Sequence, residues 1–216
     1  MVKGKKETRT KHIFPVPFTL EKMSDTIFIT TNRSCKLSKE EIIQLAYKFH
    51  SKGIISEAMK YYQYFIAKGF TESRMFSNYG AILKDLGEFK KAEIVLRRAI
   101  ELQPDFADAH FNLGITLNNL GKIEEAELEE RKWIDISFIN KIDTAYKSTC
   151  MKYLNKSKSQ FRQDLFALSE LNFKKNGFFV EFGSYDGLTG SNSYLLEKFF
   201  NWNGILAEPM ISCFTK

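Results

Sequence analysis

A period of 34 residues is the feature of this sequence that most limits its fold. Three series of small residues repeat at that spacing: Gly53, Gly87 and Gly121; Ala58, Ala92 and Ala126; and Ala46, Gly80 and Gly114. A period of this length is typical of stacked supersecondary units, each of which buries its apolar face against its neighbours. We therefore predict three copies of one unit, at residues 39–72, 73–106 and 107–140.

The middle copy, 73–106, resembles a tetratricopeptide repeat. The resemblance depends on Phe76, Tyr79, Gly80, Leu83, Gly87, Phe89, Ala92, Leu96, Ala99 and Pro104. It implies two packed helices per copy. Gly80 and Ala92 have almost no side chain, so the two helices can approach closely there, while Gly87 breaks the chain between them. Pro104 suits the turn into the next copy.

The third copy departs from this pattern. Glu130 and Trp133 replace the residues equivalent to Leu96 and Ala99. A bulky ring in place of a small residue prevents tight packing, so we expect Trp133 to pack outward against Ile136, Phe138 or the following segment. The five acids between Glu124 and Glu130 are interpreted most simply as a solvated helix face.

One polar position recurs in all three copies. Gln44, Asn78 and Asn112 occupy it, and each carboxamide offers the donor and acceptor that complement a peptide unit. In proteins that these repeats resemble, this position forms a ladder that holds extended peptides. Other residues predicted to share the groove are Tyr47, His50, Arg74, Ser77, Lys84, Phe111, Asn118 and Asn119. The alternative is that the three carboxamides are simply solvated.

The last part of the chain has a different pattern. Phe178 to Phe182 is an apolar run typical of a strand, followed by Gly183 and an Asp186-Gly187 turn. Residues 191–200 predict a helix capped by Ser191, Asn192 or Ser193, and residues 205–207 predict a second buried strand. A right-handed crossover would place the strands side by side in parallel. Glu208 would then lie at a strand tip, where an acid can hold ribose hydroxyls.

Four segments here resemble the opening of FkbM-type S-adenosylmethionine-dependent methyltransferases: SQFRQDLFAL (159–168), VEFGSYDG (180–187), SNSYLLE (191–197) and WNGILAEP (202–209). The resemblance implies an enzyme that transfers a methyl group to an oxygen. It implies that Glu181, Gly183 and Asp186 line the methionine end of S-adenosylmethionine and that Glu208 holds its ribose. It also places Asn192 at the mouth of the site, with residues 160–164 over it.

These patterns together predict a mostly α fold: a tetratricopeptide helix-hairpin solenoid followed by an incomplete Rossmann-like β-α-β unit. The expected parts are a basic flexible arm at 1–38, the repeats at 39–140, a connector at 141–158 that is helical from Ala145 to Leu154, and a shortened methyltransferase-like unit at 159–216. Two strands are marginal on their own, so we expect these 216 residues to transfer no methyl groups. Two functions remain open: a protein-interaction module joined to the start of a methyltransferase, and a peptide-binding scaffold with a vestigial α/β cap.

The charge of the chain is uneven. The net charge is +6, yet residues 1–22 have six Lys and Arg against two Glu, whereas residues 39–140 have fourteen against sixteen acids. The arm is best explained as a solubilising tail; contact with nucleic acid or anionic lipid is the weaker alternative. Ser24 to Thr31 is expected to extend as a strand or to pack on the repeats.

The sequence predicts no metal site or disulfide framework. Cys35, Cys150 and Cys213 are odd in number and far apart, and His12, His50 and His110 are scattered without a carboxylate pair at ligand spacing. No apolar run reaches the length of a membrane span, so a cytoplasmic location with a protein or peptide partner is the expectation.

Overall fold

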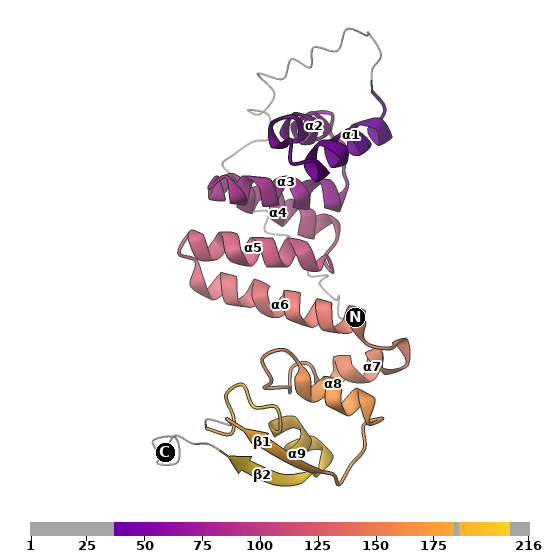
Figure 1. Cartoon of the computed structure of the whole chain (residues 1–216), viewed down its shortest axis with the longest axis vertical. Coiled ribbons are helices and arrows are strands. Elements are labelled where there is room, and N and C mark those ends of the chain that lie inside the picture. The colour runs from indigo at the N-terminus through magenta and orange to yellow at the C-terminus, as the bar shows by residue number, and fades with distance from the viewer. Residues whose placement is uncertain (1–36, 184–185, 208–216) are drawn as a thin grey trace, which may run out of the picture. The chain divides into compact units, whose positions relative to one another are not determined.

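The computed structural model describes residues 37–183 and 186–207, which form parts of two compact units, residues 1–71 and 72–216 (Figure 1). The predicted arm, the 24–31 segment, Cys35, Glu208 and Cys213 lie wholly or almost wholly outside the described residues. The first unit contains the hairpin of α1 (Lys39–Ser51) and α2 (Ile55–Ala67). Ser38 begins α1 with a capping box, because its hydroxyl accepts from the Glu41 amide at 3.2 Å and its amide donates to the Glu41 carboxylate at 2.8 Å.

The second unit begins with two successive helix hairpins. The first consists of α3 (Ser73–Asp85) and α4 (Phe89–Leu102), and the second of α5 (Ala107–Asn119) and α6 (Ile123–Lys141). Gly87 and Gly121 turn the chain between the helices with φ of +77° and +74°, a backbone region that glycine enters without strain. α5 packs against both α3 and α4, so the second hairpin is stacked on the first (Figure 1).

The second helix of the last hairpin is longer than its counterpart. α6 has 19 residues and α4 has 14. α4 ends just before Pro104, whereas the position 34 residues later is Phe138, which allows the helix to continue. α7 (Thr144–Tyr153) follows after Asp143, whose carboxylate accepts from the Ala145 amide at 2.9 Å, and α8 is Gln163–Glu170. The helix expected within the connector is therefore present.

A two-stranded sheet ends the described chain. β1 (Phe178–Phe182) and β2 (Asn203–Ala207) pair in parallel, with Phe178 opposite Asn203, and α9 (Tyr194–Phe200) lies between them in sequence. The prediction of paired parallel strands is confirmed. The helix is shorter than the expected 191–200, because residues 191–193 form the turn that precedes it.

The sheet has one covered and one open face. Phe179 packs against a buried cluster of Leu165, Leu168, Leu195, Leu196, Phe200 and Trp202. Phe178, Val180 and Phe182 alternate with it and are 64%, 50% and 81% exposed, and Ile205, the partner of Val180, is also exposed. A parallel sheet is normally covered on both faces, so this open apolar face is unusual for such strands.

Candidate functional site

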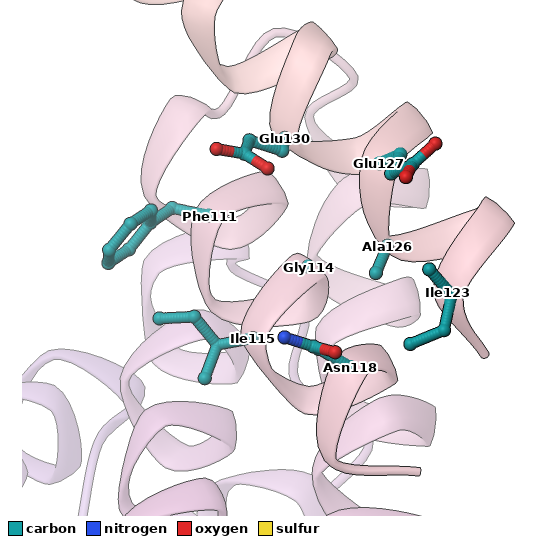
Figure 2. A pocket seen from close by; sticks show the side chains of 8 residues that line it. All are labelled: Phe111, Gly114, Ile115, Asn118, Ile123, Ala126, Glu127 and Glu130. Atoms are coloured by element: carbon teal, nitrogen blue, oxygen red, sulfur yellow. The ribbon is translucent and has the colours of Figure 1, made fainter. Parts of the chain in front are cut away.

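A cavity of about 370 Å³ opens between α5 and α6. Its lining comes from two helix faces: Phe111, Gly114, Ile115 and Asn118 of α5, and Ile123, Ala126, Glu127 and Glu130 of α6. Figure 2 shows Glu130 at the same end as Phe111, Ile123 near Asn118, and the small residues Gly114 and Ala126 between them. Phe111 and Ile123 are 41% and 46% exposed, so the cavity presents apolar surface to an incoming group.

Trp133 lies beside Phe111, a residue that lines the cavity. Its ring packs against Phe111, with centroids 4.9 Å apart. The sequence predicted outward packing against Ile136, Phe138 or the next segment. The structure instead pairs Trp133 with α5, while Phe138 and Phe161 share with it a second cavity of about 370 Å³. The pairing with Phe111 was missed because the two residues are 22 positions apart and follow no repeat rule.

The predicted carboxamide ladder is partly engaged within the chain. The Asn112 carbonyl oxygen accepts from Lys84 Nζ at 2.9 Å, and its amide donates to the Asp108 carbonyl of the same helix at 2.9 Å. Lys84 also lies 3.3 Å from the Asp85 carboxylate. Asn78 is half-buried on α3, and Gln44 is exposed on α1 in the other unit. Of the eleven residues predicted to share the groove, Phe111 and Asn118 line the cavity between α5 and α6.

A buried ionic pair joins α5 to α6. His110 Nδ1 lies 2.5 Å from Glu129 Oε2, and His110 Nε2 lies 2.9 Å from the Pro104 carbonyl oxygen. A carbonyl and a carboxylate can only accept, so this geometry favours the protonated imidazole, in which both ring nitrogens donate. Burial alone would lower the pKa of His110, but the hydrogen bonds to Glu129 and Pro104 outweigh burial and raise it.

Glu129 has the matching shift. Burial alone would raise the pKa of its carboxyl, but hydrogen bonds from His110 and Lys132 outweigh that effect and lower it. One interpretation from the sequence was wrong here. Glu129, a member of the acidic Glu124–Glu130 group, is buried rather than solvated. The pair was missed because its members lie 19 residues apart on two helices.

Glu181 of β1 binds the start of α9. Its carboxylate accepts from the amides of Asn192 at 2.8 Å and Ser193 at 3.1 Å, from the Ser191 hydroxyl at 3.2 Å, and from the Ser193 hydroxyl. These hydrogen bonds outweigh burial and hold the pKa of Glu181 below its ordinary value. The carboxylate therefore satisfies amides that the helix itself leaves without partners.

The other predicted cofactor residues lie around this turn. Gly183 has a φ of +70° and open space where a side chain would begin. The Asp186 carboxylate accepts from the amides of Leu188 at 2.9 Å and Thr189 at 2.7 Å, which lowers its pKa. Asn192 Oδ1 accepts from the Ser159 hydroxyl at 2.8 Å, and Ser159 also bonds Gln163, so the start of the 160–164 segment does lie beside Asn192. Glu208 lies outside the described residues.

Two negative findings concern the described residues. Across residues 37–183 and 186–207, no three His, Cys, Asp or Glu side chains are grouped as a metal site would require. Over the same ranges, no helix combines the length and apolar character needed to cross a bilayer.

Cys150 is buried, which raises the pKa of its thiol.

Comparisons with known proteins agree with the hairpins. Two models of the tetratricopeptide repeat family match, at residues 73–106 and 95–128, so the chain contains tetratricopeptide repeats. The first match has the same bounds as the predicted middle copy. The chain is also similar to Protein O-mannosyl-transferase Tmtc3 of Drosophila melanogaster, at 36% identity over 55 residues. That match covers 26% of this chain and 6% of the Drosophila protein.

Both family matches lie within residues 73–128. The likeness of residues 159–216 to FkbM-type methyltransferases therefore depends on the sequence motifs alone.

Proposed function

We propose that this chain is a protein-interaction module whose tetratricopeptide hairpins bind a partner polypeptide. Stacked helix repeats present extended surfaces for such binding. The observation that carries the proposal is the open cavity between α5 and α6, where half-exposed Phe111 and Ile123 lie on a hairpin of this family. Contiguous exposed apolar surface with a polar rim is typical of protein–protein contact sites.

The carboxamides supply a second part of the binding surface in this proposal. Asn78 and Asn112 would bond the backbone of an extended peptide, and Lys84 would add a cation beside them. Because Asn112 already bonds Lys84 and Asp108, a peptide has to exchange these hydrogen bonds for its own. Such an exchange gives a small net gain per hydrogen bond, which favours modest affinity.

The test is an array of extended peptides probed with the full chain and with the double variant Asn78→Ala, Asn112→Ala. We expect the double variant to lose most of the bound signal. Asn140→Ala, an exposed carboxamide of α6 away from this position, is the matched control and should bind as the wild type does. Unchanged binding by the double variant would show that the carboxamide ladder is wrong.

A second candidate function concerns residues 159–216. We propose that this unit derives from an S-adenosylmethionine-dependent O-methyltransferase of the FkbM type, with Glu181, Gly183, Asp186, Asn192 and Glu208 as its cofactor residues. The parallel β1-α9-β2 arrangement with a positive-φ glycine after β1 favours this origin. The opposing observation is that the Glu181 carboxylate already accepts four hydrogen bonds from the start of α9.

Calorimetry with S-adenosylmethionine separates the two candidates. For a chain that acts only by binding proteins, we expect no saturable heat at millimolar cofactor. Saturable heat that disappears in Asp186→Asn would instead assign a cofactor site to this unit, and methyl transfer by the purified chain would establish an enzyme.

A further inference from the structure

We propose that the cavity between α5 and α6 is a stacking groove that binds an amphipathic helix of another protein, and that Glu127 and Arg131 recognise a lysine and an acid three residues apart in the segment that directly follows that helix. The inference rests on the proposed protein-binding function and names the chemistry of the partner.

The first argument comes from the preceding hairpin. The 34-residue period relates the lining of the cavity to Ser77, Gly80, Ala81 and Lys84 of α3 and to Phe89, Ala92, Glu93 and Leu96 of α4. In that hairpin the equivalent groove is filled, because α5 packs against both α3 and α4. The same molecule therefore already binds an amphipathic helix at this place.

Exposure of matching residues shows that the later groove is open. Ser77 is 2% exposed, whereas its equivalent Phe111 is 41% exposed. Leu96 is fully buried, whereas its equivalent Glu130 is exposed. α7, the next helix in the chain, packs against α6 and α8, and any contact that it makes with α5 is far smaller than those of α5 with α3 and α4, so it does not fill the groove as α5 fills the earlier one.

The second argument is charge. Glu93 accepts from Lys122 Nζ at 2.8 Å, and Arg97 donates to Glu93 at 2.9 Å and to Glu125 at 2.5 Å. Lys122 and Glu125 belong to the following hairpin, so this cluster of four charges fastens one repeat to the next. All four are partly exposed, and pairs of this kind contribute more to register and partner choice than to affinity.

The same pair of charges recurs one repeat later without its partners. Glu127 and Arg131 are the equivalents of Glu93 and Arg97, and neither forms an ion pair within residues 37–183 and 186–207. The position equivalent to Lys122 in the chain is Lys156, whose ammonium group lies over the rings of Tyr153 and Phe199 instead. The groove thus repeats the charges that specify a following helix, while no helix after α6 in the described part of the chain packs on α5 as extensively as α5 packs on α3 and α4.

A second copy of this chain fits less well. If its first hairpin were stacked on the groove, Ile54 and Glu57 would occupy the places of Lys122 and Glu125. Ile54 offers no cation to Glu127. The acid at 57 could serve Arg131, but Glu127 and Glu130 would be buried beside an apolar residue, which is unfavourable. We therefore assign the groove to a different protein that carries the Lys-x-x-Glu pair.

The experiment uses a fluorescent peptide of residues 105–125, which comprises α5, Lys122 and Glu125 and which fills the equivalent groove within the chain. Binding to the full chain is measured by anisotropy. We expect saturable binding, weakened about tenfold by Glu127→Lys, because attraction to Lys122 becomes repulsion. A peptide carrying Lys122→Glu should bind the Glu127→Lys chain nearly as well as the original pair.

The matched control is Glu101→Lys, the same charge change at an exposed position of α4, which should leave binding unchanged. Circular dichroism verifies folding, and if Glu127→Lys does not fold, Glu127→Gln should still weaken binding about threefold. Absence of saturable binding, or equal affinity for wild type and Glu127→Lys, overturns the proposal. Self-association of the chain that Glu127→Lys abolishes would overturn the assignment to another protein.

The outcome is separable from that of the peptide array. Asn78 and Asn112 do not line this cavity, so loss of ladder binding with retained helix binding would refute the carboxamide ladder alone. Retained ladder binding with no effect of Glu127→Lys would refute the stacking groove alone.

Discussion

Two glycines at the same place in successive repeats should respond in opposite directions to alanine. Gly80 lies in α3, and a Cβ atom added there would lie 2.5 Å from Leu96 Cγ and 2.7 Å from Leu96 Cδ2. Leu96 is fully buried, so it cannot move away from the new atom into solvent without leaving the core. Gly114, 34 residues later in α5, would place its Cβ atom 3.5 Å from its nearest neighbour, the Ala126 carbonyl oxygen.

The magnitudes follow from two opposing effects. Alanine is about 1 kcal/mol better than glycine inside a helix. Overpacking a tight core costs about 1–3 kcal/mol or more, and the overlap with Leu96 is severe. We therefore expect Gly80→Ala to lower the free energy of unfolding by roughly 1–2 kcal/mol. Gly114→Ala should raise it by up to about 1 kcal/mol, because the contacts of the new methyl group are ordinary ones.

Urea denaturation followed by circular dichroism measures both changes. A double-mutant cycle with Leu96→Ala identifies the cause: once the leucine side chain is removed, Gly80→Ala should become neutral or stabilising. If Gly80→Ala stabilises the wild-type chain as much as Gly114→Ala does, the reasoning from the helix–helix contact is wrong.

Three further predictions concern buried or paired groups. Because the pKa of His110 is raised, its contribution to stability is complete below about pH 6.5 and is lost as pH rises through the folded-state pKa. Because the pKa of Glu129 is lowered, its contribution is lost as pH falls below about 4.5. Thermal melts of wild type and His110→Phe should therefore differ in pH dependence, and a constant difference would contradict the ion pair. Glu129→Gln should lower the free energy of unfolding by about 3 kcal/mol, measured in urea, because it leaves a buried imidazole without its carboxylate. Glu181→Gln should speed amide hydrogen exchange in α9, since one amide oxygen cannot replace a carboxylate that accepts four hydrogen bonds; unchanged exchange would show that α9 does not depend on Glu181.

The repeats could be predicted from the sequence because their signals are local and periodic. Gly87 and Gly121 mark turns by their backbone freedom, and Gly80 with Ala92 marks a close helix contact by lack of side-chain volume. The strands were similarly visible as short apolar runs at 178–182 and 205–207, and their parallel pairing followed from the helix between them. The second strand begins at Asn203, earlier than predicted, and is largely exposed rather than buried. Each of these inferences uses residues within one or two elements.

The candidate site could be predicted only in part. Asn118 was assigned to a groove and does line the cavity, whereas the hydrogen bond between Asn112 and Lys84 was not indicated by the sequence. Glu181 was expected to face a cofactor and bonds the start of α9. In each case the residue type was informative, but its partner came from a different element.

The sequence by itself determined the period of the helix hairpins, the places of their turns and the existence of a β-α-β segment, because backbone freedom, side-chain volume and alternation of apolar residues act over short distances along the chain. The tertiary structure alone decided that His110 pairs with Glu129, that the groove next to Glu127 is open while the one next to Glu93 is filled, and that one sheet face is exposed. These properties depend on which side chains meet across helices, and hydrogen bonding and burial at such distances are set by packing rather than by order in the sequence.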